Sequence, residues 1–184
     1  MAGNASAGVV VWFTGLPSSG KSTLAARVSS HLRDLGTAFC ILDGDEVRAA
    51  LRPTPGYSDT ERRNFYDSLA RLASLLASQG LTVLVPATAH LRAYRQRARE
   101  LAPRFIEVHV ASALGDCVTR DTKQLYSRAL AGELALVPGK GVDYEPPKAP
   151  DVVAEGGHDS KAALGIAEAI VGRQAFTGPQ TEVH

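Results

Sequence analysis

Gly15-Leu16-Pro17-Ser18-Ser19-Gly20-Lys21-Ser22 is the stretch that decides the fold, because it fits the pattern G-x-x-x-x-G-K-[ST] of a phosphate-binding loop. In such a loop the glycines let backbone N–H groups point at phosphate oxygens. Lys21 then reaches the outer phosphates, and Ser22 presents its hydroxyl to Mg²⁺. An apolar run at 9–13 precedes the loop, and apolar or small residues recur at helical spacing over 22–35. A strand before and a helix after are the setting that the motif requires, so the sequence predicts a nucleoside triphosphate site.

Strand and helix patterns alternate along the rest of the chain. Strands are expected at 9–13, 38–42, 81–85, 105–110 and 151–153, and helices at 22–35, 46–51, 59–79, 91–101, 114–130 and 162–171. Such alternation predicts an α/β fold of three layers, a mostly parallel five-stranded sheet with helices on both faces. Ligands in open sheets of this kind bind at the carboxyl ends of the strands, where the phosphate-binding loop is expected.

A chain of 184 residues, 45% of them hydrophobic, predicts a single domain over 9–171. We expect flexible ends at 1–8 and 172–184. Glycine and proline are frequent over 132–150, which is typical of a loop or lid, and we place the lid at about 120–148.

The charge and cysteine content exclude several classes of partner. A formal net charge of +1 argues against nucleic acid, and no apolar run is long enough to cross a membrane. The N-terminus lacks the basic start and apolar stretch of a signal peptide, so we expect a cytoplasmic protein. Cys40 and Cys117 belong to no metal-binding pattern and are expected to be buried, reduced thiols.

Two carboxylates, Asp43 and Asp45, flank Gly44 at the end of the expected second strand. One would hold Mg²⁺ through water, and the other would orient or deprotonate an attacking hydroxyl. The alternative is a turn with a helix-capping aspartate. Because this turn is expected one strand away from the phosphate-binding loop, we favour the catalytic interpretation.

The arginines divide into two groups. Arg48 lies one helical step after Asp45, and Arg62 lies near the start of a helix, so both are placed to bind a phosphorylated substrate. The arginines over 92–99 are expected to form a solvated helix face, from which Arg92 alone would reach the site.

Lys123 and His109 are further candidates for a catalytic role. Lys123 stands at the start of the expected lid, whose closure would bring a second cation onto the transferring phosphoryl group. The alternative is an exposed lysine. His109, flanked by valines in a strand, is expected to be structural.

Taken together, these residues resemble the adenylyl-sulfate kinase (APS kinase) family over about 10–151. The sequence Gly15 to Ala25 is close to that family's phosphate-binding loop, and Leu42-Asp43-Gly44-Asp45 with Arg48 resembles its second motif. Further matches follow in the family's order: Gly56-Tyr57-Ser58 before Arg62, Arg120-Asp121-Thr122-Lys123 before Leu125-Tyr126, and Tyr144-Glu145 before Pro147 and Pro150.

The resemblance implies a P-loop kinase fold with a lid, and transfer of the γ-phosphate of ATP to the 3′-hydroxyl of adenosine 5′-phosphosulfate. It also implies Mg²⁺, small-molecule substrates and a homodimer. Its ATP-binding residues would be Gly15, Ser18, Ser19, Gly20, Lys21, Ser22, Thr23 and Arg120. Its acceptor-binding residues would be Asp43, Arg48, Arg62, Phe65 and Lys123, with Ser22 and Asp43 at the metal and Asp45, Lys21 and Lys123 in catalytic roles.

The departures from the family pattern cluster on the acceptor side. Phe65 stands where the family has a substrate-contacting asparagine, so that amide is missing unless Asn64 substitutes from one position earlier. Ala89 replaces a serine, Gln124 a glycine, and Val137 an aromatic residue that stacks on the acceptor's adenine. Stacking of a base on an aromatic side chain contributes on the order of 1 to 3 kcal/mol, so losing it could weaken acceptor affinity about tenfold or more. Phe65 or Tyr66 would have to supply the ring instead.

Three functions therefore remain open. The first is APS kinase activity, and the second is a kinase of the same fold acting on another nucleotide-linked or natural-product hydroxyl. The third is a nucleotide-binding protein without transfer activity, which would not require Asp45 or Lys123. A GTPase is disfavoured because no Asn-Lys-x-Asp run occurs.

Overall fold

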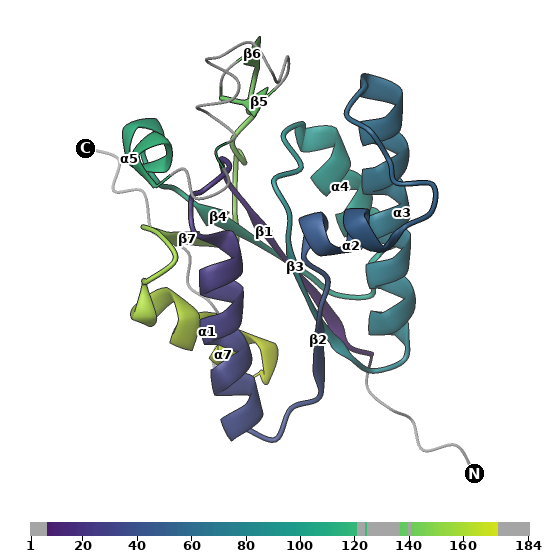
Figure 1. Cartoon of the computed structure of the whole chain (residues 1–184). Coiled ribbons are helices and arrows are strands. Elements are labelled where there is room, and N and C mark those ends of the chain that lie inside the picture. Colours follow the sequence, from purple (N-terminus) through teal and green to yellow (C-terminus); the bar gives the residue numbers. More distant parts are fainter. Residues whose placement is uncertain (1–6, 121–123, 125–136, 140, 173–184) are drawn as a thin grey trace.

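A five-stranded sheet forms the centre of the protein (Figure 1). The computed structural model describes residues 7–120, 124, 137–139 and 141–172. The strand order is β2-β3-β1-β4-β7, and each neighbouring pair is parallel. The strands are β1 Val9–Thr14, β2 Phe39–Ile41, β3 Thr82–Pro86, β4 Phe105–Val110 and β7 Val152–Ala154. The predicted α/β fold with a five-stranded sheet is confirmed, and the sheet is wholly rather than mostly parallel.

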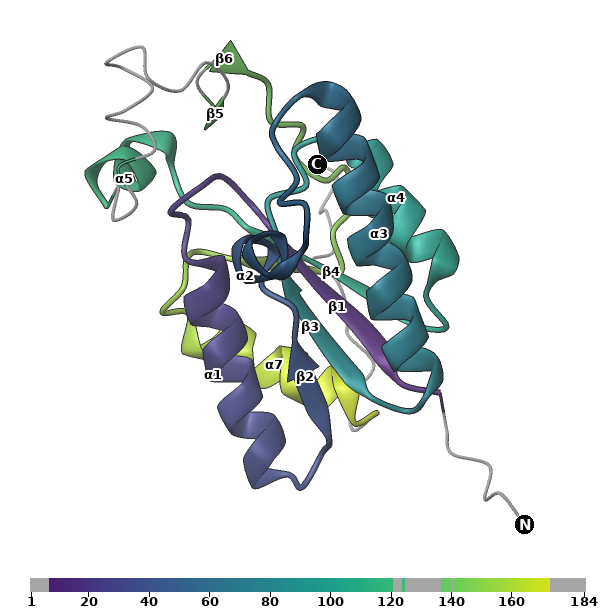
Figure 2. The same cartoon turned by 45° about the vertical axis from the view of Figure 1, so that its right-hand side comes forward.

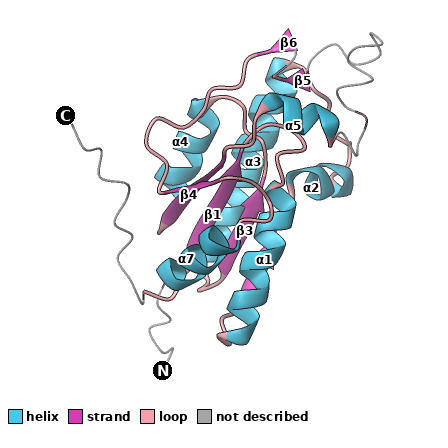
Figure 3. Cartoon of the chain, turned by 90° about the vertical axis from the view of Figure 1, so that its left-hand side faces the viewer, coloured by secondary structure: helices cyan, strands magenta, loops and turns pink. Residues whose placement is uncertain are grey.

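Helices cover both faces of the sheet, which gives the three predicted layers. The pair α1 (Lys21–Asp34) and α7 (Ser160–Ile170) packs on one face, and the pair α3 (Asp59–Ser78) and α4 (Arg92–Leu101) packs on the other (Figures 1, 2 and 3). The short helices α2 (Gly44–Ala50) and α5 (Leu114–Thr119) follow β2 and β4 at the carboxyl edge of the sheet.

The apolar run of β1 is continuous because this strand is central and is covered on both faces. Val9, Val11 and Phe13 point into the core beneath α1 and α7. Val10 and Trp12 point into the core beneath α3 and α4. Since successive side chains of a strand point to opposite faces, β1 joins the two cores and fixes where the phosphate-binding loop begins.

Two sequence expectations require correction. The second strand was expected to be buried, but β2 is an edge strand with a single neighbour; Ile41 is 41% exposed, and Cys40 is half-buried rather than buried. Cys117 is buried as expected.

The expected lid falls mainly outside the described residues. Helix α5 ends at Thr119, and the rest of the helix expected over 114–130 lies outside the described part apart from Arg120 and Gln124. Within the stretch expected to be a loop, β5 (Val137–Pro138) pairs with β6 (Gly141–Val142).

Candidate active site

A cavity of about 960 Å³ lies at the carboxyl ends of β1, β2 and β3. The phosphate-binding loop and the start of α1 form one part of its wall, through residues such as Ser18 and Lys21. Helix α2 contributes Asp45 and Arg48, and the first turns of α3 contribute Arg62. The sheet topology therefore brings together three segments that the sequence predicted to hold functional side chains (Figure 2).

The phosphate-binding loop packs closely against the turn after β7. Gly20, the N-cap of α1, has a φ of 98°, and a Cβ on it would come within 2.5 Å of the backbone N of Gly157. Both the left-handed conformation and this close approach require glycine. The N-terminus of α1 is thereby held against the cavity, where the N–H groups of its first turn favour an anion.

Two polar side chains of the loop, those of Lys21 and Ser19, lie in different surroundings. The Nζ of Lys21 donates to the carbonyl oxygens of Gly15 and Leu16, at 3.1 and 2.7 Å, and so folds back over the loop. The hydroxyl of Ser19 is fully buried and has no hydrogen-bond partner in the part of the chain that the structure describes. This hydroxyl does not line the cavity, so it belongs to the interior of the loop.

Asp43 combines the two roles that the sequence left as alternatives. Its Oδ1 accepts from the backbone N–H of Asp45 at 2.9 Å, which caps α2. Its Oδ2 accepts from the hydroxyl of Ser22 at 2.6 Å. The capping bond fixes the carboxylate so that two oxygen ligands, one just after β2 and one in the first turn of α1, lie side by side.

These two oxygens suit Mg²⁺, which binds oxygen ligands and usually takes most of the others from phosphates and water. Among the described residues, no group of three or more histidine, cysteine or acidic side chains is arranged to hold a metal by itself. The residues therefore fit a nucleotide-associated Mg²⁺ rather than a dedicated protein metal centre.

Asp45 lies in the first turn of α2 and lines the cavity with an exposed carboxylate. Its position follows from the cap, because Asp43, two residues after the end of β2, caps the helix that begins at Gly44. A Cβ at Gly44 would lie 3.0 Å from that of Ala87, so the small residue lets the helix start close to the end of β3. The expected grouping of Asp45 with the phosphate-binding loop is what the structure contains.

Both predicted acceptor arginines line the cavity and are nevertheless almost fully buried. Arg48 is 6% exposed and Arg62 is 4% exposed. The Nη1 of Arg48 donates to the carbonyl oxygens of Pro55 and Gly56, at 3.1 and 2.7 Å, and the Nε of Arg62 donates to that of Tyr57 at 2.8 Å. Arg48 makes no ion pair with any described residue, and a buried positive charge beside a cavity is expensive without an anion, so its position favours an anionic ligand.

Aromatic rings surround these arginines. Phe65 and Tyr66, successive residues of α3, line the cavity, and their ring centroids are 5.3 Å apart in an edge-to-face arrangement. Tyr66 in turn stacks on Tyr94 of α4, with centroids 4.8 Å apart. Burial raises the pKa of Tyr66, so its hydroxyl stays protonated at neutral pH.

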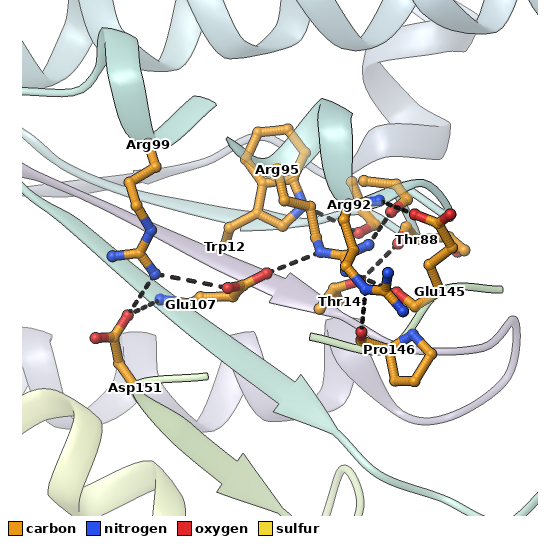
Figure 4. Close-up of polar contacts among 12 residues, drawn as sticks. Trp12, Thr14, Thr88, Arg92, Arg95, Arg99, Glu107, Glu145, Pro146 and Asp151 are labelled. Atoms are coloured by element: carbon orange, nitrogen blue, oxygen red, sulfur yellow. Dashed lines mark hydrogen bonds and ion pairs between the residues drawn. The ribbon is translucent and has the colours of Figure 1, made fainter. Parts of the chain in front are cut away.

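A buried ion pair joins helix α4 to strand β4 (Figure 4). Arg95 was expected on a solvated helix face, but its side chain is 2% exposed, and its Nε donates to Glu107 of β4 at 2.8 Å. Its other nitrogens donate to the carbonyl oxygens of Ala89 and Glu145. The expectation was wrong for Arg95 because it placed the arginines together on the solvated face, whereas Arg95 lies on the face of α4 that packs against the sheet.

Arg92 and His109 both contact the segment 144–146. Arg92 does not line the cavity; its backbone N–H donates to Glu145 and its Nε to the carbonyl of Pro146 (Figure 4). His109 lies against the ring of Tyr144, and burial lowers its pKa. Both residues organise the segment around Tyr144, which supports the structural role expected for His109.

Most predicted site residues meet in this one region. The cavity is lined by Ser18, Gly20, Lys21, Ser22, Thr23, Asp43, Asp45, Arg48, Arg62, Phe65 and Arg120, while Gly15 and Ser19 are buried within the loop itself. Lys123, predicted to assist transfer and bind the acceptor, lies outside the described residues. Four residues depart from the family pattern. Phe65 and Val137 line the cavity, whereas Ala89 is fully buried outside its lining and Gln124 is exposed.

Several residues that line the cavity were not predicted from the sequence, among them Thr88, Gly157 and His158. Gly157 and His158 come from the turn between β7 and α7, more than 130 residues after the phosphate-binding loop. The Gly156-Gly157 pair after a short strand was a local signal for a turn, but only the sheet order places that turn against Gly20.

Comparison with known families and structures agrees with this geometry. The family model described as adenylylsulphate kinase matches residues 7–155 of this chain. The chain belongs to the adenylylsulphate kinase family. Among curated members, the adenylyl-sulfate kinase of Enterobacter sp. (strain 638) is 44% identical over 151 residues, which are 81% of this chain and 75% of that protein. That of Citrobacter koseri is 43% identical over the same lengths.

Solved structures of the family have the same fold. The Mycobacterium tuberculosis APS kinase CysC in complex with AMPPNP and APS superposes with a TM-score of 0.82 and 36% identity, over 88% of this chain and 96% of that one. The protein APE1195 superposes with a TM-score of 0.80 and 32% identity, over 90% and 96%. In the described part of this family member, no helix is long and apolar enough to cross a membrane.

Proposed function

We propose that this protein transfers the γ-phosphoryl group of ATP to the 3′-hydroxyl of adenosine 5′-phosphosulfate. The observation that carries the proposal is a single cavity that joins a phosphate-binding loop to two buried arginines, with Asp45 also on its wall. A protein that only bound a nucleotide would need the loop but not this second, cationic half. The activity named for the curated relatives, and the two ligands of the mycobacterial complex, support the same assignment.

The donor half would hold ATP and Mg²⁺. Backbone N–H groups of the loop and the N-terminus of α1 would bind the phosphates, and Lys21 would turn from its carbonyl partners toward them. Ser22 and Asp43 would hold Mg²⁺, which neutralises charge on the phosphates when bound. Arg120, at the C-terminal end of α5, would close this end of the cavity.

The acceptor half would hold the phosphosulfate group. Arg48 makes no ion pair with any described residue, so an acceptor anion would supply the missing negative charge. A planar guanidinium binds phosphate or sulfate oxygens through two parallel hydrogen bonds. Arg62 and Lys123 are proposed to contact the same acceptor.

Asp45 is proposed as the base. It would accept the proton of the 3′-hydroxyl as that oxygen forms a bond to the γ-phosphorus, while the bond from the γ-phosphorus to the β,γ-bridging oxygen breaks and ADP leaves. Lys21 would stabilise the charge that develops on the transferring group. Positioning and charge stabilisation provide most of the catalysis in such a step.

The test is a direct assay of the full chain with Mg-ATP and adenosine 5′-phosphosulfate, following formation of the 3′-phosphorylated product and ADP by ion-exchange chromatography. We expect stoichiometric formation of both products. Asp45→Asn should lower kcat by about 10²- to 10⁴-fold while ATP binding is retained. Wild-type protein that binds ATP but leaves the phosphosulfate unconsumed would refute the proposal, and a panel of other hydroxyl acceptors would then identify the substrate. Light scattering of the same preparation tests the homodimer expected from the resemblance.

A further inference from the structure

We infer that Phe65 is a positioning residue that holds Arg48 ready for the acceptor. The inference rests on the proposed function and adds to it a role for a side chain that departs from the family pattern. At this position the resemblance predicted an asparagine that would contact the substrate through its amide. Phe65 has no polar group, so it would act on the acceptor through Arg48.

The guanidinium of Arg48 lies between two aromatic rings. Its Cζ is 3.8 Å from the centroid of the Phe65 ring and 4.6 Å from that of Tyr57. The two rings belong to different segments, since Tyr57 precedes α3 and Phe65 lies two turns inside it. A cation over a ring face is attracted by the ring's quadrupole, and the attraction is strongest when both are desolvated. Arg48 and Phe65 are both buried, whereas Tyr57 is 54% exposed.

The ring of Phe65 packs against a pair of stacked tyrosine rings. Its ring makes an edge-to-face contact with Tyr66, and Tyr66 stacks on Tyr94 of α4 with an interplanar angle of 27°. Helices α3 and α4 pack against each other along the same face of the sheet (Figure 2). The ring of Phe65, at 3% exposure, is thus part of the core and forms a rigid surface for Arg48.

This arrangement leaves one edge of Arg48 for a ligand. Both of its hydrogen bonds to backbone carbonyls use Nη1, and within the described residues Nε and Nη2 donate to no protein acceptor. These two nitrogens would donate to an acceptor oxyanion. An arginine that is already fixed in its binding geometry loses less conformational entropy when the ligand binds.

Phe65→Leu and Phe65→Asn test the inference together. Leucine keeps an apolar side chain without a ring face, and asparagine restores the amide expected from the family. Phe105→Leu is the matched control, because Phe105 carries Arg99 at 4.8 Å in a second arginine–phenylalanine stack that does not line the cavity. For each variant we would measure KM for the phosphosulfate at saturating ATP, KM for ATP at saturating phosphosulfate, and the thermal midpoint.

Both Phe65 variants should raise KM for the phosphosulfate by about 5- to 30-fold, while KM for ATP stays within twofold of wild type. Phe105→Leu should change neither KM. The inference is overturned if Phe65→Asn binds the phosphosulfate as well as or better than wild type, or if the Phe65 variants weaken ATP and phosphosulfate equally. Wild-type protein without phosphosulfate turnover is a different result, which would overturn the proposed function and this inference with it.

Discussion

Replacing Arg95 by alanine should destabilise the protein far more than replacing its neighbour Arg97. Arg95 is 2% exposed and pairs with Glu107, whose side chain is 12% exposed, whereas Arg97 is 42% exposed and pairs with Asp67 and Glu100 at the surface. The two residues lie two positions apart on α4 and therefore point to different faces of the helix.

The magnitude follows from what each substitution leaves behind. Removing one member of a buried ion pair costs about 3–5 kcal/mol, because the other charge stays buried without its partner. Arg99 keeps a second contact with Glu107, at 3.5 Å, so we expect about 3–4 kcal/mol for Arg95→Ala. Exposed pairs contribute only about 0–1 kcal/mol, which bounds the effect of Arg97→Ala.

Equilibrium unfolding in urea at pH 7, for wild type and the two variants, provides the free energies of unfolding. In a thermal scan the same loss corresponds to a midpoint lower by about 6–16 °C for Arg95→Ala, at about 2–4 °C per kcal/mol for a chain of this size. Similar free energies for the two variants would refute the assignment of Arg95 and Glu107 as a buried structural pair. Arg95→Met with Glu107→Leu should recover part of the loss, because it leaves no unpaired charge.

Three further predictions concern the site and its surroundings. Lys21→Ala should weaken ATP binding by about 100-fold in calorimetry, since it removes a charge-assisted contact; unchanged affinity would contradict the role of the loop. Gly157→Ala should lower the free energy of unfolding in urea by about 1–3 kcal/mol and weaken ATP binding, because its Cβ would lie 2.7 Å from the carbonyl oxygen of Gly20. Gly115→Ala is the control: its Cβ would meet nothing within 4 Å, so stability and ATP binding should both stay unchanged. Burial lowers the pKa of His90, so its neutral form is favoured in the folded state, and the associated stability is complete above about pH 6.5 and declines as the pH falls through the folded-state pKa. The free energy of unfolding of wild type should therefore fall more between pH 7.5 and pH 5 than that of His90→Gln, and equal falls would exclude His90 as a contributor.

The sequence alone was sufficient for features whose signal is local. The loop from Gly15 to Ser22 carries its own turn residues, and the apolar run of β1 and the helical spacing of α1 lie directly beside it, so chain order sets their geometry. Asp43 and Asp45 were found for the same reason, because a strand end and a helix cap are encoded within a few residues.

Features that depend on the order of strands could not be predicted in this way. The burial of Arg95 depends on Glu107, which belongs to a strand whose place beside β1 no local pattern specifies. The half-exposed β2 has the apolar composition of a buried strand, yet its position at the sheet edge removes one neighbour. Periodicity reports which side of an element is apolar, but not what covers it.

The sequence by itself determined that this protein has an α/β fold with a phosphate-binding loop, and which side chains follow the strands. Tertiary structure alone decided that Gly157 packs on Gly20, and that Arg48 lies between Tyr57 and Phe65. The physical reason is that motif residues act through backbone geometry over a few positions, whereas contacts between segments depend on how the helices pack across the sheet.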